Sequence, residues 1–388
     1  MTMQHRIHTL LLLLALTPAL HAQTWQLFDT SLRTHTLLDL NITNLSITAR
    51  DTNDQRFTLP TAQAVRLTNI HAPADESQPA NAFIRLADGQ QLFGSLRLTR
   101  ESDIINLEHP RLGRFIIPLS AITRLSLTPA AADLTAPDSG YDLIVLSNGD
   151  RIEGTFLGLT TTGTRILLAG SDQPIDLPLD TIAAVLRPQN PPANTRNDRV
   201  TLNDGTVVDA PRVTLTSNRL ALYPALGTRR AELPTSHVTQ IDLRHNGSRL
   251  VPFRQQPTRI VEPANAYGLD IPPRLSPAGQ HLHAPTTHEI TLPDNTVGII
   301  LNAQLDPSIP ETRRHWPDIA LTLTLSNIPP HSALIDQHNP AINLTIPVQP
   351  APRADTLTLD LKTAQRGPVL DRLLITQAEF LVADKSQN

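Results

Sequence analysis

The sequence predicts an all-β protein in which three or four tandem small β-barrel repeats are followed by a C-terminal jelly-roll-like β-sandwich. Three observations predict this fold class: an internal repeat, apolar alternation within each copy, and longer strand patterns after residue 245. Of the 388 residues, 40% are hydrophobic, which is enough for packed cores and argues against a wholly disordered chain.

The internal repeat is defined by a turn glycine and a strand-ending proline that lie 29 positions apart. The pairs are Gly89 with Pro118, Gly149 with Pro178, and Gly205 with Pro234. Successive glycines are separated by 60 and then 56 residues. A degenerate copy precedes them, because the segment 57–60 resembles 115–118 at an offset of 58 residues, with Ser31 in place of the turn glycine.

Each copy is expected to contain five short strands. The Asp-Gly or Asn-Gly pair lies between runs of alternating apolar residues and predicts a type I′ hairpin turn. Gly94 and Gly154 follow in the next strand and indicate a bend or a close approach of two strands. The proline removes a ladder donor, and the pattern Pro-x-x-x-[Ile/Val]-x-x-[Leu/Val/Ile] predicts a short helical turn before a closing strand.

The N-terminus is typical of a secretory signal peptide. Arg6 provides positive charge, the apolar run Leu10 to Leu16 is too short to span a bilayer, and Pro18 with Ala22 suits cleavage after Ala22. The mature chain is therefore expected to be periplasmic or secreted, without an integral membrane segment of its own.

These patterns divide the chain into six predicted segments. They are a signal peptide at 1–22, a degenerate small-barrel repeat at 23–72, small β-barrel repeats at 80–130, 138–188 and 196–245, and a β-sandwich at 246–388.

Two resemblances to known families follow from these segments. The repeats resemble the tandem Sm-like or Src-homology-type small β-barrels of bacterial envelope proteins. In the C-terminal region, the segments 279–293 (GQHLHAPTTHEITLP), 297–306 (VGIILNAQLD) and 367–381 (GPVLDRLLITQAEFL) resemble the NPCBM family of carbohydrate-binding modules. This resemblance implies a galactose-binding-like sandwich with a carbohydrate ligand, and it places His283 at the structural histidine of the family.

Composition excludes several other function classes. The net charge of −4 provides no basic surface for a nucleic-acid partner. The absence of cysteine excludes disulfides, thiolate catalysis and zinc–cysteine sites. The sequence also has no Gly-x-Ser-x-Gly elbow and no phosphate-binding glycine loop, so we expect a protein that is not an enzyme.

The candidate ligand-binding residues are Tyr267, His283 and Trp316. Tyr267 and Trp316 are the only Tyr or Trp after residue 245, and sugar rings stack on aromatic side chains. Because aromatic residues are so few, the sequence favours a packed core around these three residues over a concave pocket.

A structural Ca²⁺ site is one cofactor that the sequence offers. Asp306, Asp318 and Asp371 could supply its carboxylates, with solvated loop residues as the alternative. His281 and His288, together with His283, could instead supply imidazole ligands to a metal, with core histidines as the alternative.

Three functions remain open. The leading one is a non-catalytic, exported binding or scaffold protein of the cell envelope, whose partner is a glycan or an envelope protein. The second is an accessory subunit of an extracytoplasmic enzyme complex. The third is a carboxylate-dependent hydrolase, which would need two carboxylates about 5–10 Å apart in a cleft. The oligomeric state stays open.

Overall fold

The computed structural model describes most of the chain after residue 22. The described residues are 23–73, 82–98, 103–127, 140–161, 163–188, 196–216, 218–245, 247–266, 269–276, 278–326, 328–349, 355–367 and 370–383. In these ranges the regular structure is antiparallel strand, and each helical segment is a 3₁₀ turn of three residues. The all-β prediction is therefore confirmed, and no helix in the described residues has the length and hydrophobicity to cross a membrane. The predicted signal peptide 1–22 and Tyr267 lie outside these residues.

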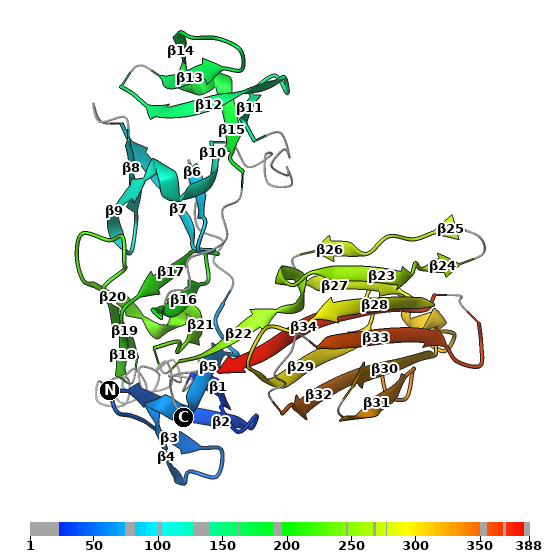
Figure 1. The fold of residues 1–388 in the computed structure, drawn as a ribbon. Helices are drawn as coiled ribbons and strands as arrows, with labels where there is room; N and C mark the ends of the chain where they lie inside the picture. The colour runs from blue at the N-terminus through cyan, green and yellow to red at the C-terminus, as the bar shows by residue number, and fades with distance from the viewer. Residues whose placement is uncertain are drawn as a thin grey trace, which may run out of the picture.

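The N-terminal part contains four units with the same strand connections (Figure 1). In each unit the first four strands form a meander, a 3₁₀ turn follows, and the last strand pairs with the first. The first and second units comprise β1 (Thr24–Asp29), β2 (Thr34–Ile42), β3 (Ser46–Asp51), β4 (Arg56–Pro60), η2 (Thr61–Gln63), β5 (Ala64–Asn69), β6 (Ala82–Leu86), β7 (Gln91–Arg97), β8 (Ile104–His109), β9 (Gly113–Pro118), η3 (Leu119–Ala121) and β10 (Ile122–Ser126).

The third and fourth units repeat this plan. They comprise β11 (Asp142–Leu146), β12 (Arg151–Leu159), β13 (Thr164–Leu168), β14 (Pro174–Leu177), η5 (Leu179–Thr181), β15 (Ile182–Leu186), β16 (Asp198–Leu202), β17 (Val207–Ala210), β18 (Val213–Thr216), β19 (Arg219–Leu222), β20 (Ala231–Pro234), η6 (Thr235–His237) and β21 (Val238–Asp242). In the fourth unit, the second strand is divided into β17 and β18 at Pro211. Within each unit no ladder joins the described fourth and last strands, so each predicted small barrel is a curled sheet without a closed ring of strands.

The glycine turns have a different geometry from the predicted one. Gly89, Gly149 and Gly205 have φ of 88°, 92° and 85°, whereas the residue before each of them does not have a positive φ. A type I′ turn requires positive φ at two residues, so that prediction is wrong. In the second unit Gly89 N–H donates to the Leu86 carbonyl, and Leu86 N–H donates to the Gln90 carbonyl. This pattern is typical of a three-residue loop with a left-handed glycine.

The other local predictions within the repeat are confirmed. A Cβ atom on Gly94 would lie 2.5 Å from the Glu108 carbonyl oxygen, and one on Gly154 would lie 2.5 Å from that of Leu167. Both positions are therefore close approaches of two strands. A 3₁₀ turn follows the predicted proline in all four units.

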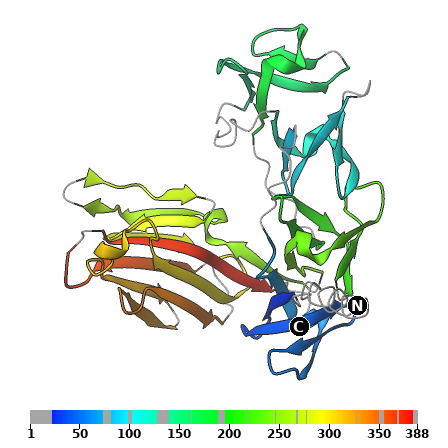
Figure 2. The same ribbon diagram turned by 180° about the vertical axis from the view of Figure 1, so that it is seen from behind.

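The four units do not stack in sequence order. Figures 1 and 2 show a column in which the fourth unit (198–242) lies between the first (24–69) and the second (82–126), with the third (142–186) at the far end. The contacts that set this order join last strands: β5 pairs with β21, and β10 pairs with β15, both antiparallel. Leu67 faces Ile241, and Leu125 faces Val185. These are equivalent positions of the repeat, so each pair of units is related by a local two-fold axis.

The second and fourth units exchange polar contacts. The buried His109 ring lies 3.1 Å from Thr206 Oγ1 and 3.2 Å from Asp204. Arg199 of the fourth unit donates to the Asp88 carbonyl of the second unit at 2.7 Å. It also donates to the Asp209 carboxylate of its own unit at 2.6 Å. Burial alone would lower the pKa of Arg199, but the Asp209 carboxylate outweighs it and the pKa is raised. The charged guanidinium therefore remains paired at this contact.

The C-terminal part is a sandwich of two antiparallel sheets. One has the strand order β26-β27-β34-β29-β32 with β22 also paired to β34, and the other has the order β23-β28-β33-β30-β31. The bounds are β22 (Ser248–Pro252), η7 (Phe253–Gln255), β23 (Thr258–Glu262), β24 (Asn265–Ala266), β25 (Leu269–Asp270), β26 (Arg274–Ser276), β27 (Gly279–His283), β28 (Thr286–Thr291), β29 (Thr296–Leu305), η8 (Glu311–Arg313), β30 (Ile319–Leu325), β31 (Ile328–Ile335), β32 (Ala341–Pro347), β33 (Thr356–Thr363) and β34 (Arg372–Ala383). The core between the sheets includes Leu301, Leu321, Leu359 and Phe380, and the predicted sandwich is confirmed.

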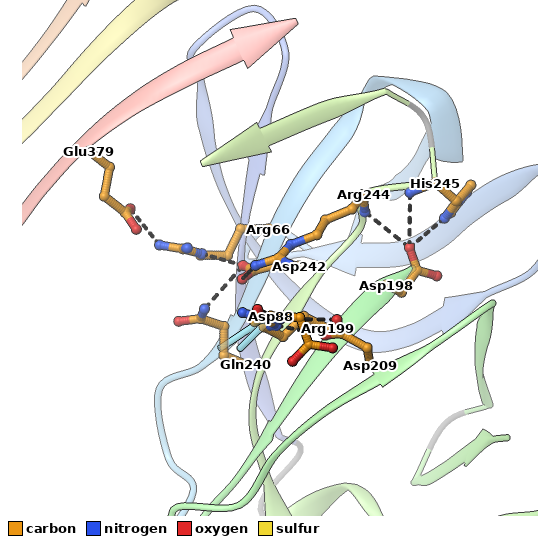
Figure 3. Close-up of polar contacts among 10 residues, drawn as sticks. All are labelled: Arg66, Asp88, Asp198, Arg199, Asp209, Gln240, Asp242, Arg244, His245 and Glu379. Carbon is orange, nitrogen blue, oxygen red and sulfur yellow. Dashed lines mark hydrogen bonds and ion pairs between the residues drawn. The ribbon is translucent and has the colours of Figure 1, made fainter. Parts of the chain in front are cut away.

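An ion cluster joins this sandwich to the column of units (Figure 3). Arg66 on β5 donates to Asp242 on β21 and to Glu379 on β34, with N···O distances of 2.6 Å in both cases. Its side chain is only 13% exposed. Burial alone would lower the pKa of Arg66, but the two carboxylates outweigh it and raise the pKa. One guanidinium therefore joins the first unit, the fourth unit and the sandwich.

An apolar contact also joins the first unit to the sandwich. Val65, Leu250, Ile300 and Leu381 are buried together between the first unit and the sandwich. Leu32 also packs here, because a Cβ atom on Gly298 of β29 would lie 2.6 Å from Leu32 Cδ2. The sandwich is thus docked on the column through side chains as well as through the chain connection.

Leu32 also corrects the prediction for the degenerate repeat. The left-handed position of its first turn is Leu32, with φ of 63°, and not Ser31. Leu32 N–H donates to the Asp29 carbonyl and Asp29 N–H to the Arg33 carbonyl, as in the glycine turns. The Leu32 side chain packs in the contact with the sandwich, which a glycine at this position could not fill.

Candidate functional site

A depression of about 510 Å³ lies at one end of the sandwich. Its lining residues come from three connections: His315 and Trp316 between η8 and β30, Gln337 between β31 and β32, and Arg366 between β33 and β34. These connections meet because Ile319 at the start of β30 pairs with Ile335 at the end of β31 and with Thr363 at the end of β33. The volume is in the range of small-molecule sites in proteins.

Trp316 provides the exposed aromatic surface of this pocket. Its side chain is 45% exposed, and its ring meets the His315 ring edge to face at a centroid distance of 5.8 Å. The backbone N–H of Trp316 donates to the Arg313 carbonyl at 3.1 Å, and this bond ties the loop to the preceding 3₁₀ turn. The expectation of a packed core is therefore wrong for Trp316.

Asp318 fixes the loop that carries Arg366. Its carboxylate accepts the N–H groups of Gln365 at 2.8 Å and of Arg366 at 3.0 Å. Its backbone carbonyl accepts Ala364 N–H at 2.8 Å. Arg366 Nη1 in turn donates to the His315 carbonyl. The two loops that carry Trp316 and Arg366 are thus bonded to each other.

Asp371 lies beneath this loop and is fully buried. Its Oδ1 accepts Asp318 N–H at 3.1 Å, whereas Oδ2 has no hydrogen-bond partner among the described residues. Burial, together with the nearby Asp318 charge, raises the pKa of Asp371 to about 7. A buried carboxyl thus supports the backbone of a loop that forms the pocket.

Gln337 is held by a turn stabilised by Asp336. The Asp336 carboxylate accepts the N–H groups of His338 and Asn339, both at 2.8 Å. These bonds, with the Asn339 N–H contributing most, lower the pKa of Asp336. Gln337 Nε2 lies 2.9 Å from His338 Nε2. The turn therefore presents an amide to the pocket while its carboxylate is engaged by the backbone.

The proposed calcium ligands do not form one site. The Asp306 carboxylate lies 2.9 Å from His281 Nδ1 and accepts Ser308 N–H at 2.8 Å. Asp318 and Asp371 contact each other instead. Burial alone would raise the pKa of Asp306, but Ser308 and His281 outweigh it and the pKa is lowered. In the described ranges no three His, Asp or Glu side chains are grouped so that they could hold a metal ion. The roles of Asp318 and Asp371 are instead those of loop supports.

The histidines also serve local contacts. His283 Nδ1 lies 2.8 Å from the Ala284 carbonyl, and burial lowers the pKa of His283. His288 is buried beside Thr286 at 3.2 Å, and burial lowers its pKa as well. The pocket lining does not include His283. Of the three ligand-binding candidates, the structure places only Trp316 at the pocket, since Tyr267 is not among the described residues.

Sequence reasoning missed the other lining residues. His315 is adjacent to the predicted Trp316, so adjacency was one available signal. Gln337 and Arg366 lie far away in sequence, and only the strand register brings them to Trp316.

Comparison with known proteins gives a limited result. No protein-family model matches the chain, and no curated protein matches its sequence. The solved structure of CBM51 from Clostridium perfringens GH95, in complex with methyl-galactose, is 14% identical and matches 34% of this chain and 99% of its own, with a TM-score of 0.23. CBM51-2 and INT domains from Clostridium perfringens ZmpB, in complex with GlcNAc, are 11% identical and match 55% of this chain and 46% of theirs, with a TM-score of 0.26.

A further similar structure comes from another kind of protein. The glycoside hydrolase family 43 arabinoxylan arabinofuranohydrolase from Bacillus subtilis, in complex with cellotetraose, is 10% identical and matches 90% of this chain and 96% of its own, with a TM-score of 0.23. The structural matches thus include carbohydrate-binding modules and a glycoside hydrolase, all at low similarity. The function is therefore argued from the pocket itself.

Proposed function

We propose that this chain is a non-catalytic glycan-binding protein and that a sugar binds in the pocket formed by His315, Trp316, Gln337 and Arg366. The observation that carries the proposal is the half-exposed Trp316 ring in a depression that also has an amide and a guanidinium. A sugar offers an apolar C–H face and a rim of hydroxyl groups. An aromatic face with nearby polar groups suits both parts of such a ligand.

The absence of a carboxylate from the pocket lining supports a binding role over hydrolysis. The four lining residues that the structure describes include neither Asp nor Glu. Asp318 and Asp371 lie beneath the loop, where the described contacts of Asp318 are to backbone N–H groups. The proposal therefore assigns these two carboxyls to structure, and it places no acid–base pair beside the sugar.

The proposal includes export and a scaffold role for the column of units. The N-terminal pattern favours a secretory signal peptide with cleavage after Ala22 and a periplasmic or secreted location. Arg66 and the apolar contact hold the sandwich against the column. In this arrangement the four units would hold the sugar-binding end away from an envelope attachment or partner. The resemblance to NPCBM agrees with this proposal.

Replacing Trp316 with alanine should weaken sugar binding at least tenfold. The substitution removes the ring on which the sugar stacks, and burying a large apolar side chain contributes about 1.5–3 kcal/mol, where 1.4 kcal/mol is tenfold. A screen of the mature chain on a glycan array identifies the ligand, and titration calorimetry with that sugar then compares the two proteins.

Tyr141→Ala is a matched control for this prediction. Tyr141 is 44% exposed, almost the same as Trp316, but it directly precedes β11 of the third unit, and that unit lies at the far end of the column. Its loss should leave sugar affinity unchanged. A blank glycan array, or equal affinity in the wild type and Trp316→Ala, would refute the proposed function.

A further inference from the structure

We infer that the pocket selects sugars that carry a carboxylate, such as glucuronic or galacturonic acid, and that Arg366 is the residue that recognises it. This inference rests on the proposed function and specifies the ligand class of the same site. The starting observation is that Arg366 is the one guanidinium among the described lining residues of the pocket, which also include Trp316.

The Arg366 guanidinium is oriented but not neutralised. Its Nη1 donates to the His315 carbonyl, and its backbone N–H is held by Asp318. Among the described residues no carboxylate forms an ion pair with Arg366. The Arg366 charge is near enough to Asp336 to contribute to the lowered pKa of Asp336. The Asp336 carboxylate is engaged by His338 and Asn339 N–H groups instead.

The remaining edge of the guanidinium suits a carboxylate. Arginine has five N–H donors, and a carboxylate accepts two parallel N–H bonds from Nε and Nη2. With Nη1 bonded to His315, that edge is the part of Arg366 left for a ligand. A carboxylate accepts both N–H groups of this fork, whereas a neutral hydroxyl group makes a single, weaker hydrogen bond.

The other charges near the pocket balance one another. Arg313 and Arg314 belong to the segment just before Trp316, and Arg314 lies 3.8 Å from the exposed Glu311. Asp318 is buried and bonded to the loop backbone. Three arginines, Arg313, Arg314 and Arg366, and three carboxylates, Glu311, Asp318 and Asp336, thus belong to these segments. The selectivity for a carboxylate therefore comes from the Arg366 guanidinium itself and not from a net positive charge.

The test uses pairs of sugars that differ only at C6. Calorimetry compares the methyl glycosides of glucose and glucuronic acid, and of galactose and galacturonic acid, with the full mature chain. We expect the uronic acid of at least one pair to bind about tenfold more tightly, because hydrogen bonds between a guanidinium and a carboxylate are stronger than those to a neutral hydroxyl group. This preference should shrink in 0.5 M salt.

Two Arg366 variants test the role of the guanidinium. Arg366→Gln should abolish the preference for the uronic acid, and Arg366→Lys, which keeps the charge without the fork, should lose most of it. Retained binding of the neutral sugar by both variants shows that the pocket is intact. If a variant binds neither sugar, the salt titration of the wild type becomes the test of charge recognition.

The possible failures are distinguishable. Equal binding of neutral and acidic sugars would overturn the carboxylate inference but leave the proposed function standing. A preference for a sulfated sugar over the uronic acids would also overturn it. If no sugar of either kind binds the wild type, the proposed function itself fails.

Discussion

Replacing Arg66 with methionine should lower the free energy of unfolding by about 3 kcal/mol. The substitution leaves the Asp242 and Glu379 carboxylates buried without their shared cation, and breaking a buried ion pair costs about 3–5 kcal/mol. Gln240 and Gln377 still donate to these carboxylates at 3.0 and 2.7 Å. Because the carboxylates keep these donors, we expect a loss at the lower end of that range. Urea unfolding of the full chain measures the loss, and small-angle X-ray scattering should show a larger radius of gyration as the sandwich separates from the column.

Arg165→Met is the matched control for Arg66. Arg165 forms a two-bond ion pair with Asp176 at 2.9 and 3.0 Å, but both side chains are nearly half exposed. Exposed pairs contribute about 0–1 kcal/mol, so this variant should unfold almost as the wild type does. If Arg66→Met were equally mild, the ion cluster would not be what joins the sandwich to the column.

Replacing Asp371 with asparagine should make the protein more stable above pH 7. The pKa of Asp371 is about 7 in the folded protein against an ordinary value of 3.8. Between these pH values the unfolded chain loses the proton and the folded chain keeps it, so wild-type stability falls as pH rises from about 4 to 7. At about 1.4 kcal/mol per unit, the full cost is on the order of 4 kcal/mol. Asparagine carries no charge and should remove this loss.

Unfolding by urea from pH 4 to pH 8 measures the effect. The difference between Asp371→Asn and the wild type should grow with pH and level off above pH 7. Asp336→Asn is a control of opposite sign, because the pKa of Asp336 is lowered and its stabilising contribution is lost as pH falls. An Asp371→Asn protein that is less stable than the wild type at pH 8 would contradict this account.

The repeat pattern predicted the units because its signals are local. A glycine in a turn, a proline at a strand end and alternating apolar residues act within a few positions, so the five strands and the 3₁₀ turn could be read from them. The details that depend on tertiary contacts were missed. Leu32 replaces the turn glycine because its side chain packs against Gly298, far away in sequence.

The order of the units and the pocket depend on long-range contacts. Pairing of β5 with β21 places the fourth unit beside the first, and nothing in the repeat itself selects that partner. Similarly, Trp316 was identifiable from residue type, whereas Arg366 reaches it only through the register of β30 and β33. Asp318 and Asp371 were noticed for their carboxylates, and their contacts with backbone N–H groups gave them a different role.

The most direct test of sugar binding at Trp316 is acrylamide quenching of tryptophan fluorescence. The chain has two tryptophans, and Trp25 is 1% exposed whereas Trp316 is 45% exposed, so quenching reports mainly on the pocket. A saturating sugar should reduce quenching in the wild type and have no effect in Trp316→Ala. A sugar that binds by calorimetry while leaving the quenching of Trp316 unchanged would contradict the central claim.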